Sequence, residues 1–226
     1  MEFSLHRQLK DHYAGRDGRC EVSHNGYRID VVRRGELIEI QHGSLAAIRQ
    51  KTAALLAADH RLRIVKPIVA AKVIVKQKSR GGKVVHRRRS PKRGVLLDIF
   101  HELVYFTRVF PHRRLVLDVP LVEIEEWRYP GHGRRRWRRP NDHRVEDQRL
   151  VRIVSRAQFC KAADLLNLLP ADLPQPFHSA GLAESLNIDR WVAQRIAYCL
   201  RETGALATVG KEGNALLYAF PTARVA

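Results

Sequence analysis

Apolar and polar residues alternate along Y-R-I-D-V-V-R-R-G-E-L-I-E-I-Q, which spans residues 27–41. A period of two is typical of β-strands with one buried face, and Arg34-Gly35 in the middle suits a two-residue hairpin turn. With this turn, Asp30 lies directly opposite Glu39 on the polar face, which Gln41 shares. The opposite face of the predicted hairpin is apolar and holds Ile29, Val31, Ile38 and Ile40.

The segments around the hairpin predict an α/β unit. Apolar residues spaced three or four apart predict helices, and β-branched runs bounded by turn residues predict strands. In chain order we expect a helix, three strands, a second helix capped by Ser44, and two more strands. Their predicted ranges are 2–13, 19–23, 27–33, 36–42, 44–60, 61–69 and 72–78.

The middle of the chain predicts a basic extension of this unit. A basic segment with loop signals at both ends is followed by a helix, an extended run, a basic loop bounded by Pro and Gly, and a returning strand. These segments cover residues 79–94, 95–107, 114–127, 129–142 and 143–154.

The last part of the chain has a different pattern. A helix is predicted at 155–169, and after a proline-rich connector the order is helix, helix and hairpin, at 178–186, 187–204 and 205–220. This order is typical of a winged helix-turn-helix. We therefore expect an α/β protein with three domains: a core at 1–80, a basic insertion at 81–154 and a winged helix at 155–226.

Composition indicates a folded protein, since 45% of residues are hydrophobic and 28% are charged. No apolar run approaches the ~18 residues of a membrane span. The start carries Glu2 and lacks the apolar stretch of a signal peptide. The three cysteines are too widely spaced for a zinc or disulfide pattern. We expect a cytoplasmic protein without a membrane partner.

Charge is distributed unevenly along the chain. The net charge of +18 divides into +8 over residues 1–80, +8 over 81–150 and only +2 over 151–226. Clustered positive charge predicts a polyanion partner for the first two thirds of the chain. DNA is the expected partner, and RNA stays an alternative.

Two arginine-rich segments and one helix supply the candidate nucleic-acid contacts. Arginine matches phosphate geometry, and an interleaved tryptophan can stack on an unpaired base. A solvated loop or a protein-docking surface is the alternative for the two segments, and a protein-interaction or dimer module is the alternative for the winged helix. The predicted contacts are Arg87, Arg88, Arg89, Lys92, Arg93, Arg134, Arg135, Arg136, Trp137, Arg138, Arg139, Arg190 and Arg195.

The opposed acids of the hairpin carry the candidate chemistry. Like charges directly opposite each other in a sheet are destabilising, and a bound Mg²⁺ would remove the repulsion. The alternative is an exposed hairpin in which each acid pairs with an arginine such as Arg28. The motif D-(8 residues)-E-x-Q, formed by Asp30, Glu39 and Gln41, resembles the signature of the PD-(D/E)xK nuclease superfamily. The order of elements over residues 1–70 is similar to the αβββαβ core of that superfamily.

The resemblance implies an endonuclease that hydrolyses phosphodiester bonds with Mg²⁺ or Mn²⁺. Glu2, Asp30 and Glu39 would hold the metal. Gln41, which stands where the family has lysine, would orient water or phosphate, and Lys51 would stabilise charge in the transition state. Cutting two strands would favour a homodimer. The alternative is a non-catalytic DNA-binding regulator or adaptor with a degenerate nuclease fold.

Overall fold

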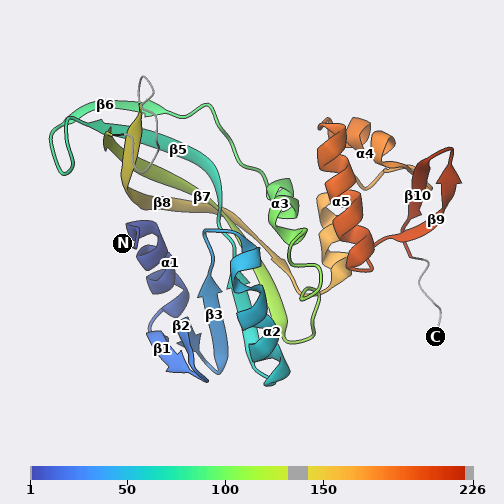
Figure 1. Ribbon diagram of the computed structural model, residues 1–226, viewed down its shortest axis with the longest axis horizontal. Coiled ribbons are helices and arrows are strands. Elements are labelled where there is room, and N and C mark those ends of the chain that lie inside the picture. The colour runs from blue at the N-terminus through green and yellow to red at the C-terminus, as the bar shows by residue number, and fades with distance from the viewer. Residues whose placement is uncertain (1, 132–141, 222–226) are drawn as a thin grey trace. The chain divides into compact units, whose positions relative to one another are not determined.

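The computed structural model describes residues 2–131 and 142–221 of the chain (Figure 1). The helices are α1 (Ser4–Ala14), α2 (Arg49–Ala57), α3 (Ile99–Leu103), α4 (Ser179–Leu186) and α5 (Arg190–Glu202), with 3-10 helices η1 (Leu45–Ile48), η2 (Leu96–Asp98) and η3 (Ala162–Leu168). The strands are β1 (Arg19–His24), β2 (Tyr27–Arg33), β3 (Glu36–Ile40), β4 (Arg61–Val65), β5 (Ile68–Gln77), β6 (Val84–Arg89), β7 (Leu115–Pro130), β8 (His143–Phe159), β9 (Ala207–Glu212) and β10 (Ala215–Ala219).

The predicted α/β class is confirmed by a mixed sheet. Within the described residues, this sheet has eight strands: seven follow the order β1-β2-β3-β4-β7-β5-β6, and the eighth, β8, pairs with β7. The pairs β1–β2, β2–β3 and β5–β6 are antiparallel, whereas β5–β7 is parallel. A separate two-stranded sheet contains β9 and β10.

The hairpin of β2 and β3 has the predicted turn and register. Arg34 and Gly35 have φ angles of 49° and 76°, as a two-residue type I′ turn requires. Val31 is paired with Ile38, and Arg33 with Glu36. The predicted solvent-exposed face is absent from β3, because its last four residues, Glu39 included, are all buried.

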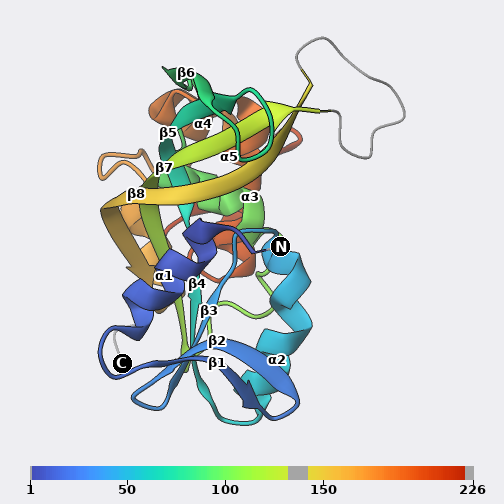
Figure 2. The ribbon, with the colours of Figure 1, turned by 90° about the vertical axis from the view of Figure 1, so that its left-hand side faces the viewer.

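The chain divides into two compact units. The first contains Met1–His42, Val65–Leu96 and Val119–Ala157. In this unit, α1 lies against β1, β2 and β3 (Figure 2). The fully buried Leu5 and Leu9 of α1 belong to an apolar core that also includes residues of β2, β3, β4 and β7, and partly buried residues of β5 and β8 pack against it. The Ser4 hydroxyl donates a hydrogen bond to Asp147, and the Gln8 amide oxygen accepts one from the Leu150 N–H, at 2.8 Å each. Both partners belong to β8.

The second unit contains Gly43–Ile64, Leu97–Asp118 and Gln158–Ala226. Its core includes the fully buried Phe100, Phe106 and Phe110, and Cys199 of α5 lies 3.8 Å from the Phe100 carbonyl. Glu102 accepts a hydrogen bond from the Leu45 N–H at 2.9 Å, and so fixes the start of η1. Helices α4 and α5 are followed by the β9–β10 hairpin, in the predicted order.

The predicted helix at 155–169 is wrong. Strand β8 continues to Phe159, and η3 supplies only 3-10 structure after it. The end of β8 is held by one hydrogen bond, which Gln158 donates to Asp118 at 3.1 Å, and by the burial of Phe159, whose side chain is 2% exposed. Pairing with β7 therefore outweighs the helical propensity of this segment.

Other boundaries also differ from the prediction. The basic segment at 79–94, expected to be irregular, contains β6, because its backbone pairs with β5. The helix predicted at 44–60 starts as η1, where the Ser44 hydroxyl accepts from the Ala46 N–H, and ends at Ala57. The helix predicted at 95–107 is limited to η2 and α3. The break between β4 and β5 falls at Lys66-Pro67, since proline has no N–H for a ladder.

Candidate functional site

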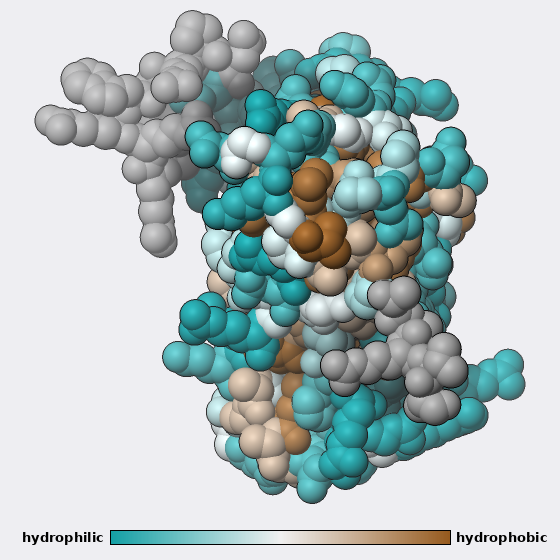
Figure 3. Space-filling model, turned by 90° about the vertical axis from the view of Figure 1, so that its right-hand side faces the viewer, coloured by the Kyte–Doolittle hydropathy of each residue, from teal (hydrophilic) through white to brown (hydrophobic). Residues whose placement is uncertain are grey.

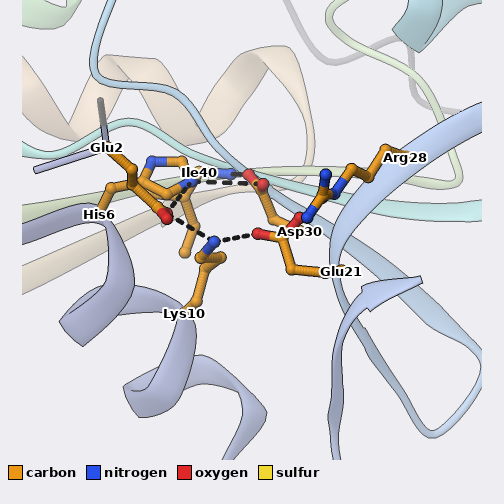
Figure 4. A network of polar contacts seen from close by, with 7 residues as sticks. All are labelled: Glu2, His6, Lys10, Glu21, Arg28, Asp30 and Ile40. Carbon is orange, nitrogen blue, oxygen red and sulfur yellow. Dashed lines mark hydrogen bonds and ion pairs between the residues drawn. The ribbon is translucent and has the colours of Figure 1, made fainter. Parts of the chain in front are cut away.

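Three ionisable side chains near the start of the chain meet β1 and β2. His6 and Lys10 lie one turn apart on the same side of α1, and Glu2, which precedes the helix, contacts both of them (Figure 4). The Glu2 carboxylate lies 3.5 Å from His6 Nε2 and 2.6 Å from Lys10 Nζ. Together with Glu21, Arg28 and Asp30 these residues form what we call the α1–β2 cluster.

Asp30 is the half-buried centre of this cluster. Its Oδ1 lies 3.3 Å from His6 Nε2, and its Oδ2 accepts the Ile40 N–H of β3 at 2.8 Å. Burial acts to raise the pKa of Asp30, but the bonds from His6 and Ile40 outweigh burial and hold this pKa below its usual value. Asp30 is therefore an ionised carboxylate at neutral pH.

Lys10 joins the acids of the cluster. Its side chain is 5% exposed and makes ion pairs with both Glu2 and Glu21. Burial acts to lower the pKa of Lys10, but the two carboxylates outweigh it and raise that pKa. The bond from Lys10 is the main cause of the lowered pKa of Glu21, which also pairs with Arg28. Arg28, which the alternative hypothesis pairs with one of the opposed acids, forms an ion pair with Glu21.

Two residues that the sequence did not single out lie beside Asp30. The ring of His42 is 5.6 Å from the ring of His6, and Lys66, 6% exposed, donates to the His42 carbonyl at 3.0 Å. Burial, His6 and Lys66 together lower the pKa of His42 to about 4, against an opposing effect of Asp30. The buried Nε2 of His42 has no hydrogen-bond partner among the described residues. The only sequence signal for His42 was its position directly after Gln41.

The remaining predicted catalytic residues have different surroundings. Glu39 is 6% exposed in β3. Gln41 follows β3, and its N–H donates to the Val65 carbonyl at 2.8 Å. Lys51 belongs to α2 in the second unit.

The donor chemistry of Glu2, Asp30 and Glu39 is that of hard carboxylate oxygens, which Mg²⁺ prefers. Their arrangement is less suitable. Both oxygens of Asp30 are engaged by His6 and the Ile40 N–H, and Glu2 pairs with His6 and Lys10. Over residues 2–131 and 142–221, no group of three or more His, Cys, Asp or Glu is placed to hold a metal ion. The residues in this arrangement therefore do not fit the implied metal.

The first unit also carries a strongly basic segment. Residues 65–96 include eleven Lys or Arg and no Asp or Glu. The β5–β6 pairing places Lys76 opposite His86 and Val75 opposite Arg87, so that alternate residues face opposite sides of the sheet. All six residues of β6 are exposed. We call the exposed Lys76, Lys78 and Arg88 the β5–β6 surface.

This surface borders a pocket of about 740 Å³, lined in part by Lys76, Arg88, Arg128, Tyr129 and His143. Acids of β7 bind several neighbouring cations: Glu125 pairs with Arg87, and Glu126 pairs with Lys72 and Arg128. These pairs neutralise Arg87 in part, whereas Arg88 faces the pocket.

The other predicted contacts have separate positions. Lys92 and Arg93 follow β6, and the Lys92 N–H donates to the Ser90 hydroxyl at 3.3 Å. On α5, Arg190 is exposed, and Arg195 bonds His101 at 2.6 Å and lies over the ring of Trp191. The predicted contacts Arg134, Arg135, Arg136, Trp137, Arg138 and Arg139 lie outside the described residues.

The low pKa of His42 predicts a loss of stability in mild acid. The unfolded chain binds a proton as the pH falls through 6.5, whereas folded His42 resists protonation down to about 4. Between pH 7.5 and pH 5 the free energy of unfolding should therefore fall by about 2 kcal/mol from this residue. Urea denaturation of wild type and His42→Asn between pH 7.5 and pH 5 measures this change in the free energy of unfolding. The variant should have the flatter pH profile, and the matched variant of the exposed His86, His86→Asn, should keep the wild-type profile. Equal profiles for wild type and His42→Asn would contradict the assignment.

Comparison with known proteins gives a family without an assigned activity. A family model described as "Domain of unknown function (DUF8091)" matches residues 3–160. A protein of Treponema pallidum (strain Nichols), described as an uncharacterized protein, is 29% identical over 220 residues, which cover 96% of this chain and 84% of the relative. No solved structure matches the chain. No described helix is both long and apolar enough to cross a membrane.

Proposed function

We propose that this chain, which belongs to the family described as domain of unknown function (DUF8091), binds nucleic acid through its β5–β6 surface. The observation that carries the proposal is the basic segment 65–96, with eleven cations and no acid, folded into β5 and an exposed β6. Lys76 of β5 and Arg88 of β6 are positioned on strands, so their spacing is set by the sheet, and Lys78 directly follows β5. A row of cations at fixed spacing suits a phosphate backbone.

A winged helix at the C-terminus is the second element of this proposal. The order α4, α5, β9 and β10 supports it, as does an additional pair between Phe177 and Tyr218 that extends the hairpin. A pocket of about 410 Å³ between α5 and the hairpin is lined by Arg190, Gln194 and Asn214, among others. The face drawn in Figure 3 is mainly hydrophilic, with hydrophobic residues exposed near its centre and again lower down. These features suit an accessory contact with the grooves of DNA.

Salt dependence of binding tests the proposed function. The probe is a fluorescein-labelled 20-base-pair DNA duplex, measured by anisotropy between low and physiological salt, with a hairpin RNA beside it. Three phosphate contacts at the β5–β6 surface should give a slope of log K against log salt of about −3 or steeper. Binding that is unaffected by salt, or absent at the lowest salt, would overturn the proposal.

Hydrolysis of the bound nucleic acid, by a PD-(D/E)xK-like core, is the second candidate function. It is favoured by the chain order α1, β1, β2, β3, α2, β4 and by the polar residues buried around Asp30. Polar groups that are buried with perturbed pKa values are concentrated at functional sites, and the unpartnered Nε2 of His42 is one such group. A divalent metal would supply an activated water in such a reaction. Since the carboxylates are not arranged to hold one, no step is derived through it.

A further inference from the structure

A second basic pocket lies on the opposite side of β6 from Arg88. It measures about 450 Å³ and is lined by residues of β5, β6, β7 and β8 and of the segment after β6, all in the first unit. Arg89 is paired with Val73 in the β5–β6 register, one residue along from Arg88, and so faces the other side of the sheet. The cations of the lining are Lys72, Arg89, Arg93 and Arg152, against the one acid Glu123.

Glu123 holds one wall of this pocket in place. It accepts two parallel hydrogen bonds from Arg152, from Nε and from a terminal nitrogen, at 2.8 Å each. These bonds are the main cause of the lowered pKa of Glu123, and Arg89 and Arg93 lower it further. Arg89 and Arg93 therefore line the same pocket as this ion pair. Lys72 is bonded to Glu126, so the charge in excess comes from Arg89 and Arg93.

The segment that carries Arg93 is fixed to β5 by its backbone. The Ser90 N–H donates to the Lys72 carbonyl at 2.9 Å, and the Gly94 N–H donates to the Val69 carbonyl at 3.0 Å. A Cβ atom at residue 94 would lie 2.7 Å from the Val69 oxygen, so only glycine allows this approach. The backbone at Arg93 is thus held in position before any ligand binds, which lowers the entropy cost of binding.

The rest of the lining is apolar. Val151 and Val154 of β8 are 57% and 47% exposed, and Ala70, Ala71, Val73 and Ile124 complete the surface. The volume lies within the range of about 300–1,000 Å³ that is usual for small-molecule pockets. The pocket therefore offers an anion site next to an apolar surface. A phosphate on a flat, weakly polar ring system matches both parts.

We infer that this pocket binds the phosphate and base of a single nucleotide, either free or at the end of a nucleic-acid strand. The guanidinium groups of Arg89 and Arg93 would bind the phosphate oxygens in the paired geometry that arginine favours. The base would lie against Val151 and Val154. The strand-end form of this inference rests on the proposed nucleic-acid binding, whereas the free-nucleotide form does not.

Calorimetric titration of the full-length protein with adenosine 5′-monophosphate, adenosine and inorganic phosphate tests the inference. Wild type should bind the monophosphate more tightly than either part alone. Arg93→Gln and Arg89→Gln should each weaken binding by about tenfold. Arg16→Gln, the matched change at an exposed arginine outside both basic surfaces, should leave it within about twofold. Equal affinity of Arg93→Gln and wild type for the monophosphate would overturn a nucleotide site.

A second pair of probes identifies the form of the ligand. A single-stranded oligonucleotide with a 5′-phosphate is compared with the same strand carrying a 5′-hydroxyl. A preference for the phosphate that Arg93→Gln removes supports a strand-end site, and monophosphate binding without such a preference supports a free-nucleotide site. If the protein neither binds the monophosphate nor prefers the 5′-phosphate strand, the inference is overturned. The duplex affinity of Arg93→Gln separates this result from the first proposal, because duplex binding that persists in Arg93→Gln does not depend on this pocket.

Discussion

Simultaneous replacement of Lys76, Lys78 and Arg88 by alanine is expected to weaken duplex DNA binding by on the order of 10²- to 10³-fold near 0.1 M salt. The three side chains are exposed and lie on β5, on β6 and on the connection between these strands. Each contact with a phosphate releases about one counterion, so the slope of log K against log salt should become shallower by about 3. Anisotropy titrations at several salt concentrations measure both quantities.

The control for this prediction has the same loss of charge at other positions. Arg16, Arg19 and Arg108 are exposed and lie outside the β5–β6 surface. Their triple alanine variant should lose less than about threefold in affinity, since surface charges distant from a contact are largely screened. If both triple variants lost affinity equally, the total charge would be responsible, and the assignment of the surface would be wrong.

Replacement of Asp30 by asparagine is expected to lower the rate of any nucleic-acid cleavage at the α1–β2 cluster by at least about 10²-fold, the usual contribution of a general acid or base. Asp30 is the ionised, half-buried carboxylate of the α1–β2 cluster, and asparagine keeps its size and removes its charge. The assay uses supercoiled, linear, branched and single-stranded DNA with Mg²⁺ or Mn²⁺, and circular dichroism checks the folding of each protein.

Asp17→Asn is the matched control for this variant. Asp17 is exposed and pairs with Arg34 at 2.9 Å, outside the cluster. The Asp17→Asn variant should cleave DNA at the wild-type rate. Cleavage by Asp30→Asn at the rate of Asp17→Asn would contradict a catalytic role for the cluster. If wild type binds DNA but does not cleave it, the second candidate function fails and the proposed binding function remains.

The local pattern of the sequence was sufficient for the first half of the fold. The alternation at 27–41 and the Arg34-Gly35 pair predicted a hairpin whose turn and register are confirmed. The end of β8 could not be predicted in this way, because residues 155–159 are extended through pairing with β7, which is distant in sequence. For the same reason, β6 was expected to be irregular, since its strand conformation comes from β5.

The candidate site was predicted only in part. The sequence indicated Glu2 and Asp30, which the structure brings to the same histidine, His6. It did not indicate that His6 would contact Asp30 or that Lys10 would bind Glu21, because ion pairs between a helix and a strand depend on packing rather than on spacing. His42 and Lys66 were also missed, since a single histidine or lysine has no recognisable motif. The structure does not test the roles assigned to Gln41 and Lys51.

Strand β6 is the last strand in the order β1-β2-β3-β4-β7-β5-β6 of the described sheet, and its outer backbone groups have no further strand to pair with. Such an edge is a template for the strands of other molecules, and charged side chains discourage that pairing. Arg87, Arg88 and Arg89 on β6 would therefore repel another copy of the chain. A polyanion that neutralises these arginines would remove this protection. The solubility of the protein should thus be lowest at the charge-balance point of its complex, and addition of either more protein or more polyanion should restore it.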